Sequence, residues 1–242
     1  VAETMSYTNG RYRAWTTKYA GHTASVLAIV EGYNNTSGFD RGHGDASVVV
    51  DRESGDVLMM CASGDVRYGK STRKNPIRVG RYYGKSNGTA WSGGDITTSI
   101  YNINSQLTKA FFSSGRMCQS TQIKVGSHYR VYAGLVTNLG TIVLYSDDFG
   151  GSWSQLGSVA YKDGDESKIV ELPDGSVLVS AKVPNTTSGN KGRAINVFKY
   201  SESPTKSTPA LGSWTTAVLS CGSIRDGGGL YSPPCNGEML IV

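Results

Sequence analysis

The residues best suited to chemistry lie in one acidic stretch that runs into an apolar strand pattern. Asp163, Asp165 and Glu166 come directly before the segment 167–172, which reads Ser-Lys-Ile-Val-Glu-Leu. A carboxyl group at the start of a strand can act as a general base if it faces a cavity, or it can be a solvated surface group. Residue type and spacing alone leave both interpretations of Glu166 open. Glu171, further along the same segment, is better explained as a structural residue of the strand.

Other catalytic signatures are absent from the sequence. It has no G-x-S-x-G, no H-E-x-x-H, no P-loop and no G-x-G-x-x-G after a strand. His22, His43 and His128 each lie in turn-like contexts, and a Ser-His-Asp triad could be assembled from them only by arbitrary choice. The small number of histidines and the lack of a C-x-x-C pair argue against zinc, and no cofactor is indicated.

The four cysteines fall into two kinds. Cys61 and Cys118 lie in apolar or strand-like surroundings, which are typical of buried free thiols. Cys221 and Cys235 bracket a Gly-rich loop and could form a disulfide in an oxidising compartment, because only such a compartment preserves the bond.

The formal net charge of +5 favours an anionic partner without defining one. Basic residues are scattered, and only the segment 78–83 approaches a basic stripe interleaved with aromatics, so we expect no nucleic-acid partner. No apolar run reaches the length of about 18 residues that a membrane helix needs, so no membrane span is predicted. The oligomeric state is not indicated.

The elements that would position these groups are predicted to be strands. Glycine is abundant (31 residues), only 18% of residues are charged, and no long apolar stretch of helical period is present. Three hairpins are predicted from pairs of apolar runs that flank a turn: 46–50 with 56–61, 120–124 with 129–133, and 168–172 with 176–180. We therefore expect an all-β fold with few helices. The chain shows no internal linker, so one domain over residues 1–242 is expected.

The segment Ser146–Trp153 follows the apolar run 141–145 and has the pattern S-x-D-x-G-x-S-W. Asp148 can accept hydrogen bonds from nearby backbone amides, Gly150 can take a positive φ, and Trp153 can fold back as an apolar plug. Taken alone, the segment is a folding device without direct chemistry.

The four tryptophans suggest that this turn recurs. They are Trp15, Trp91, Trp153 and Trp214, separated by 76, 62 and 61 residues, and three of them have a tyrosine eight positions earlier. A period of about sixty residues suits a four-stranded propeller blade with long loops. The spacing predicts about four blades.

Several segments together carry a resemblance to a known family. Ser146–Trp153 resembles the Asp-box, or BNR repeat, of sialidases, and residues 163–176 resemble the N-E-[SAP]-[KQ]-x-[VE]-E-L-x-D-G segment of bacterial exo-sialidases. With residues 115–130 before them and 235–238 after them, they resemble the glycoside hydrolase sialidases (neuraminidases) of gut Bacteroidetes in order and spacing. The resemblance covers the chain from about Gly38 to its last residue.

This resemblance implies a six-bladed β-propeller that hydrolyses terminal sialic acid from glycoconjugates with retention. Such enzymes bind the substrate carboxylate with three arginines, use an aspartic acid as acid/base, and attack with a tyrosine that a glutamate activates. Glu166 matches that glutamate. Lys182 occupies the place of the second arginine, Arg193 could take over that role, and Arg116 is a further candidate for substrate binding. The resemblance also implies an exported bacterial protein, in the periplasm, secreted or at the cell surface.

The chain departs from the family in several places. It has no F/Y-R-I-P segment for the first arginine and no acid/base aspartate after one, and the third arginine and the tyrosine are expected beyond Val242. We therefore expect the middle part of a catalytic domain, with negligible sialoside hydrolysis by residues 1–242 alone. A catalytically inactive glycan-binding propeller and a purely structural propeller are the alternatives.

Overall fold

A computed structural model describes residues 43–64, 66–86, 91–183, 193–202, 210–220 and 239, together with the backbone of three N-terminal strands. In chain order the elements are β1 (Glu3–Thr8), β2 (Arg11–Thr16), β3 (Gly32–Tyr33), β4 (His43–Val50), β5 (Val57–Ser63), the 3-10 helix η2 (Tyr68–Lys70), β6 (Arg78–Gly84), β7 (Trp91–Asp95), α1 (Thr97–Asn102), β8 (Ala110–Phe112), β9 (Gly115–Arg116), β10 (Cys118–Val125), β11 (His128–Thr137), β12 (Gly140–Ser146), β13 (Ser154–Gln155), β14 (Ser167–Glu171), β15 (Val177–Lys182), β16 (Arg193–Tyr200), β17 (Gly212–Trp214) and β18 (Val218–Ser220).

The strands of the described residues form four mainly antiparallel sheets, none of them closed. The first contains β1 to β3. In each of the others, four consecutive strands pair in chain order: β4 to β7 in the second sheet, β10 to β13 in the third and β14 to β17 in the fourth. The remaining strands are additions, since β9 pairs in parallel with β4, β8 with β11, and β18 with β16.

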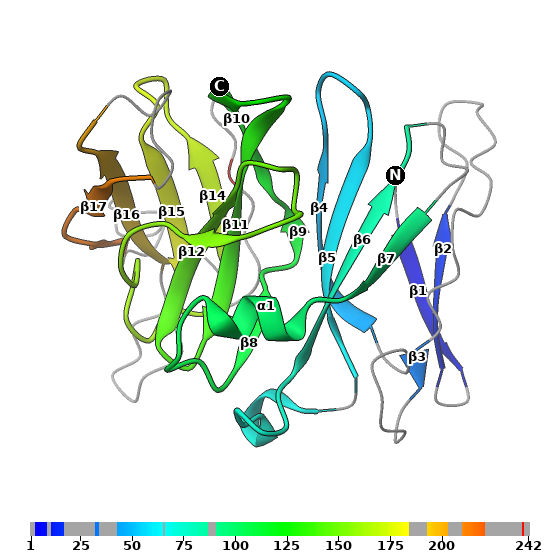
Figure 1. Cartoon of the computed structure of the whole chain (residues 1–242). Coiled ribbons are helices and arrows are strands. Elements are labelled where there is room, and N and C mark those ends of the chain that lie inside the picture. Colours follow the sequence, from blue (N-terminus) through cyan, green and yellow to red (C-terminus); the bar gives the residue numbers. More distant parts are fainter. Residues whose placement is uncertain are drawn as a thin grey trace, which may run out of the picture.

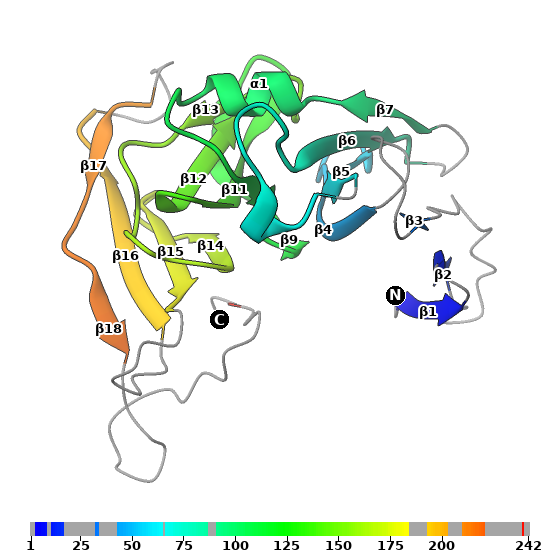
Figure 2. The same ribbon diagram turned by 90° about the horizontal axis from the view of Figure 1, so that it is seen from below.

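The sheets follow one another around an arc, with β1–β3 at one end and β14–β18 at the other (Figures 1 and 2). The predicted all-β class and the three predicted hairpins are confirmed, and α1 is the α-helix of the described part of the chain. Sequentially paired four-stranded sheets in an arc define a propeller-like architecture. The number of blades stays a prediction.

The third sheet is buried on both faces. Leu135, Ile142 and Leu144 belong to a core shared with the second sheet, whereas Val143 and Tyr145 belong to a core shared with the fourth. A strand that alternates between two apolar layers needs a continuous apolar run, because neither face meets water. This requirement explains the run 141–145.

The turn predicted from Ser146–Trp153 has the expected geometry. Asp148 Oδ1 accepts the Ser152 backbone N–H at 2.8 Å, and Gly150 has φ +83°. The Ser146 hydroxyl donates to Asp148 Oδ1 at 2.8 Å and accepts the Gly150 N–H at 2.7 Å. Trp153 packs edge-on against Phe112 of its own sheet, with ring centroids 5.5 Å apart. Each structural role that the residue types predicted for this turn is confirmed.

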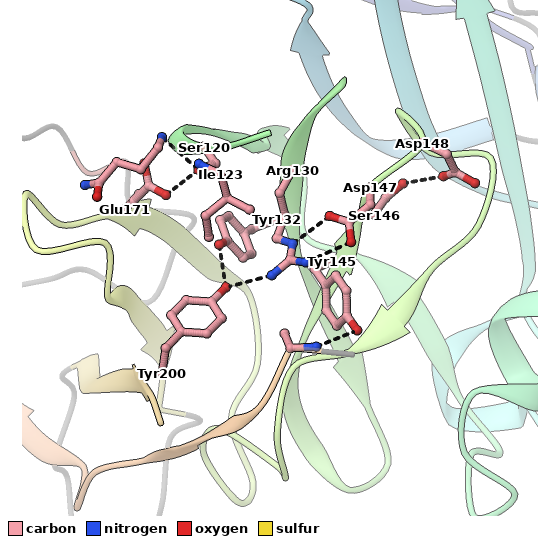
Figure 3. Close-up of polar contacts among 12 residues, drawn as sticks. Ser120, Ile123, Arg130, Tyr132, Tyr145, Ser146, Asp147, Asp148, Glu171 and Tyr200 are labelled. Atoms are coloured by element: carbon pink, nitrogen blue, oxygen red, sulfur yellow. Dashed lines mark hydrogen bonds and ion pairs between the residues drawn. The ribbon is translucent and has the colours of Figure 1, made fainter. Parts of the chain in front are cut away.

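The third and fourth sheets also share a buried polar cluster (Figure 3). Arg130 is fully buried and donates from Nε and Nη2 to Asp147 at 2.6 and 2.8 Å. Its Nη1 donates at 3.3 Å to the hydroxyl of Tyr200 on β16, which lies 2.6 Å from the Tyr132 hydroxyl. Burial alone would lower the pKa of Arg130, but its bonds to Asp147 and Tyr200 raise it. The cluster thus keeps a buried charge paired between two sheets.

Glu171 forms a second polar link between these sheets. Its carboxylate accepts the Ser120 hydroxyl at 2.5 Å (Figure 3) and the Thr121 backbone N–H at 2.6 Å. Glu171 is therefore a structural residue that ties β14 to β10, as its position in the strand predicted.

Cys61 is a buried free thiol, as predicted, whereas Cys118 is a free thiol that is only partly buried. Burial raises the pKa of both to about 11, so both stay protonated at neutral pH. Cys221 and Cys235 lie outside the described residues. No helix of the described residues is long and apolar enough to cross a membrane.

Candidate functional site

One pocket of about 720 Å³ brings together charged side chains from the second, third and fourth sheets. Its lining residues are Asp45, Tyr68, Lys109, Phe111, Val136, Thr137, Asn138, Gly140, Asp163, Gly164, Asp165, Glu166 and Lys182. They lie near the start of β4, in η2, next to β8, in the turn between β11 and β12, ahead of β14 and at the end of β15. The volume is in the range of ligand pockets.

Glu166 and Lys182 meet in this pocket because of the hairpin register. Ser167 pairs with Ala181, so Glu166, one residue before β14, lies opposite Lys182. The Lys182 ammonium is 3.1 Å from the Glu166 carboxylate and 3.2 Å from that of Asp165. Burial alone would lower the pKa of Lys182, but the bonds to Glu166 and Asp165 raise it.

Arg193 does not line the pocket, but its hydrogen bonds support the backbone of the residues that do. It is buried; its Nε donates to the Ser180 hydroxyl at 2.6 Å, and its Nη2 donates to the main-chain oxygens of Ser180 and Glu166 at 2.5 and 3.2 Å. Burial lowers its pKa, an effect that the Glu166 carboxylate opposes. The guanidinium therefore holds the backbone that carries Glu166, and its predicted role in substrate binding stays a prediction.

Arg116 is also outside the pocket lining. It lies on β9, which pairs with β4, and its Nη2 donates to the Met239 main-chain oxygen at 2.8 Å. The structure thus brings together Glu166 and Lys182 and places Arg116 apart from them.

Asp45 is a pocket residue that the sequence did not single out. The pairing of β4 with β5 is irregular between Gly44 and Ser47, and Asp45 has the left-handed φ of 51°. Bulges of this kind redirect side chains and are frequent next to active sites. One signal was available: Asp45 lies near the beginning of β4 and Glu166 directly before β14, and each of these strands is the first of four that pair in chain order.

The surroundings of Asp45 favour its protonated form. Desolvation by the pocket walls raises the pKa of its carboxyl, and the charges of Glu166 and Asp165 raise it further. The side chain is nevertheless open to solvent, so a ligand in the pocket could reach it. The pocket therefore combines a carboxyl group whose pKa is raised, Asp45, with a carboxyl group that is paired with a lysine, Glu166.

Tyr68 also lines the pocket. Its hydroxyl donates to the Thr137 main-chain oxygen at 3.0 Å, and its ring meets Phe111 edge-on with centroids 5.6 Å apart. Burial raises the pKa of Tyr68, and the charge of Asp165 raises it further. A phenol in this state is a poor nucleophile, so Tyr68 serves the pocket as a fixed aromatic wall.

The structure is similar to solved sialidases, although no protein-family model and no curated protein matches the sequence. The leech intramolecular trans-sialidase, complexed with 2,7-anhydro-Neu5Ac, is 12% identical with a TM-score of 0.50, over 74% of this chain and 39% of that one. The NanB sialidase of Streptococcus pneumoniae, solved as a point mutant, is 14% identical with a TM-score of 0.49, over 74% and 39%. The intramolecular trans-sialidase of Ruminococcus gnavus, in complex with oseltamivir carboxylate, is 17% identical with a TM-score of 0.42, over 89% and 46%.

The similarity to the leech enzyme shows a sialidase-like fold. The chain spans less than half the length of each of these sialidases. A fold alone does not define an activity, because function depends on the site.

Proposed function

We propose that the protein is a sialidase-type glycoside hydrolase that releases terminal sialic acid from glycoconjugates. The leech trans-sialidase of similar fold holds 2,7-anhydro-Neu5Ac after soaking with 3'-sialyllactose. The observation that carries the proposal is the placement of Asp45 and Glu166 in one pocket with opposite charge environments. A site of this kind needs one carboxyl group that donates a proton to the leaving group and one that accepts the proton of the tyrosine nucleophile.

Asp45 is the proposed general acid. It would donate its proton to the glycosidic oxygen as the bond from that oxygen to the anomeric carbon breaks, and the leaving group would depart as an alcohol. The resulting Asp45 carboxylate could then accept a proton from the attacking water. The raised pKa suits the first step, because the proton must be retained until the substrate is bound.

Glu166 is the proposed base. In its ionised form it would accept the proton of a tyrosine hydroxyl that attacks the anomeric carbon. A neutral phenol suits a carbon that already bears a carboxylate, since a carboxylate nucleophile would be repelled, and a phenol of pKa about 10 needs a base. Lys182 holds Glu166 in place, and Arg193 holds the backbone beneath it.

The complete architecture that we propose is a six-bladed propeller to which this chain contributes about four blades. Its proposed partners are sialylated glycans, and its proposed location is outside the bacterial cytoplasm, in the periplasm, at the cell surface or secreted.

A glycan-binding propeller without catalysis is the second candidate. The engagement of Lys182, Arg193 and Arg116 with protein groups favours it, because none of the three is arranged as a bidentate clamp for a substrate carboxylate. Such a protein would bind sialylated glycans without turnover.

Hydrolysis of a fluorogenic sialoside by the complete protein tests the proposal. We expect turnover, and Glu166→Gln should lower kcat by about 10²-fold or more, because the amide cannot accept the proton. Glu53→Gln is the matched control, since Glu53 is an exposed residue that pairs with Lys124 away from the pocket. Binding of sialyllactose without turnover would favour the second candidate, and neither binding nor turnover would contradict both.

A further inference from the structure

The two lysines that line the pocket differ in their contacts with protein carboxylates. The Lys182 ammonium lies between Asp165 and Glu166, at 3.2 and 3.1 Å. The Lys109 ammonium lies 5.0 Å from the centroid of the Tyr68 ring. Within the part of the chain that the structure describes, no hydrogen bond or ion pair is formed by the Lys109 side chain. The charge of Lys182 is therefore already paired with protein carboxylates. The ammonium of Lys109 lies over the Tyr68 ring, and its charge is not paired with a carboxylate of the described residues.

Lys109 is held in place through both its side chain and its backbone. Tyr68, under the ammonium, is fixed by its hydrogen bond to Thr137 and by its contact with Phe111. The backbone N–H groups of Lys109 and the preceding residue donate to Asn138 Oδ1 at 3.3 and 2.8 Å. A cation over an aromatic face keeps its charge and its N–H donors, because the ring only attracts it. Lys109 and Tyr68 together thus form a wall of the pocket that carries an ordered positive charge.

The remaining charges of the pocket are mostly negative. Asp163, Asp165 and Glu166 line it, and Lys182 is paired with two of these three carboxylates. An anionic sugar that enters this pocket would be repelled by the carboxylates unless a cation bound its charge. Among the described residues that line the pocket, Lys109 is the cation left for that purpose.

We propose that Lys109, held over Tyr68, binds the carboxylate of the substrate. This inference rests on the proposed function, since it takes the ligand to be a sugar that carries a carboxylate. It assigns to Lys109, held over Tyr68, the role that the family resemblance implied for Lys182. Lys182 then becomes a positioning residue for Glu166.

The test compares two ligands that differ in one charge: the α-methyl glycoside of N-acetylneuraminic acid and the methyl ester of that glycoside. Binding of each to the complete protein is measured by calorimetry at neutral pH and low salt. The wild type should bind the acid about tenfold or more tightly than the ester, because a charge-assisted hydrogen bond discriminates on this scale. Lys109→Met should lose that preference and keep its affinity for the ester.

Two further variants make the result specific. Lys109→Arg retains the charge and should keep most of the preference for the acid. Lys70→Met removes an exposed lysine of η2 outside the pocket lining, and should behave as the wild type. Unchanged binding of the ester shows that each variant is folded.

Two results would overturn the inference. If Lys109→Met binds the acid as tightly as the wild type does, while Lys182→Met does not, then Lys182 is the binding cation and the proposed function stands. If the wild type binds neither ligand, the inference and the proposed function both fail.

Discussion

Asp45 reaches the pocket because its backbone departs from the regular ladder of β4. The left-handed φ of 51° and the irregular pairing between Gly44 and Ser47 turn it toward residues that precede β14. Desolvation raises the pKa of its carboxyl group most, and the charges of Glu166 and Asp165, which precede a strand of another sheet, raise it further. The environment of the proposed general acid thus depends on the contact between sheets.

The first prediction concerns the pH dependence of that acid. In the proposed mechanism Asp45 acts in its protonated form, so activity should fall as the pH rises through its pKa. Asp165→Asn removes one of the negative charges that raise this pKa, and ionisation of Asp45 becomes easier. The alkaline limb of the profile of kcat/KM should therefore move to lower pH.

Asp163→Asn is the matched control for this measurement, because Asp163 lines the same pocket but is not among the groups that raise the pKa of Asp45. An alkaline limb that stays in place in Asp165→Asn, or that moves to higher pH, would contradict the assignment of Asp45.

The two carboxyl groups of the site differed in how far the sequence predicted them. Glu166 and Lys182 flank a predicted hairpin, so their meeting follows from local register. The family resemblance pointed to the same pair. Asp45 was missed because its position requires a bulge and a contact between segments far apart in the chain, and neither leaves a periodic pattern. The hydrogen bonds from Arg193 to main-chain oxygens were not predicted either, because they too leave no periodic pattern in the sequence.

At the scale of elements, the turn Ser146–Trp153 shows how a short segment closes a sheet. Asp148 accepts the Ser152 N–H, the Ser152 hydroxyl and the Ser146 hydroxyl, at 2.8, 2.7 and 2.8 Å. A side chain added at Gly150 would come within 2.5 Å of Leu58, so the turn also fits closely against the second sheet. The turn therefore affects both its own strands and the packing between sheets.

The prediction at this scale concerns stability. Asp148→Ala should lower the free energy of unfolding by about 1–2 kcal/mol, because several hydrogen bonds are lost from a partly solvated site. Asp148→Asn keeps an acceptor for the Ser152 N–H and should lie between the wild type and Asp148→Ala. Urea denaturation followed by fluorescence measures both.

The pH dependence of this effect follows from the pKa of Asp148. Burial alone would raise it, but the bonds from Ser152 and Ser146 lower it. The contribution of the charge is therefore complete above the unfolded-state pKa of about 3.9, and it is lost as the pH falls through the lower folded-state value. A difference between the wild type and Asp148→Asn that grows on acidification would contradict this explanation.

The strands of this region were largely predictable, since each predicted hairpin is formed by turn residues between apolar runs. The parallel pairing of β9 with β4 was not predictable. It depends on a two-residue segment, Gly115–Arg116, that is brought beside β4 by the packing of two sheets, and a segment so short carries no periodic signal.

At the scale of the whole molecule, polar links and apolar cores together join neighbouring sheets. Arg130 connects Asp147 to Tyr200 across the third and fourth sheets, and Glu171 connects β14 to β10. A buried arginine that lost its partner would be costly, so these links favour one arrangement of the sheets over others. A fixed arrangement is what the site requires, because its carboxyl groups come from different sheets.

The four tryptophans follow one another along the chain in the same order as the four sheets. Trp15 lies in β2, Trp91 in β7 and Trp214 in β17, and Trp153 comes directly before β13. Each sheet therefore has one tryptophan in or next to one of its strands. The spacing carries this information because each sheet uses a similar length of chain, whereas the closure of a propeller depends on contacts that no single repeat encodes.

The most direct test of the central claim compares two substrates whose leaving groups differ in their need for a proton. Methylumbelliferone leaves readily as an anion, whereas the lactose of sialyllactose must be protonated as it leaves. If Asp45 is the general acid, Asp45→Asn in the complete protein should lower kcat/KM for sialyllactose by about 10²-fold or more, and should lower it far less for the methylumbelliferyl sialoside. Equal losses on the two substrates, or no loss on either, would contradict the assignment of Asp45 as the acid of a sialidase-type site.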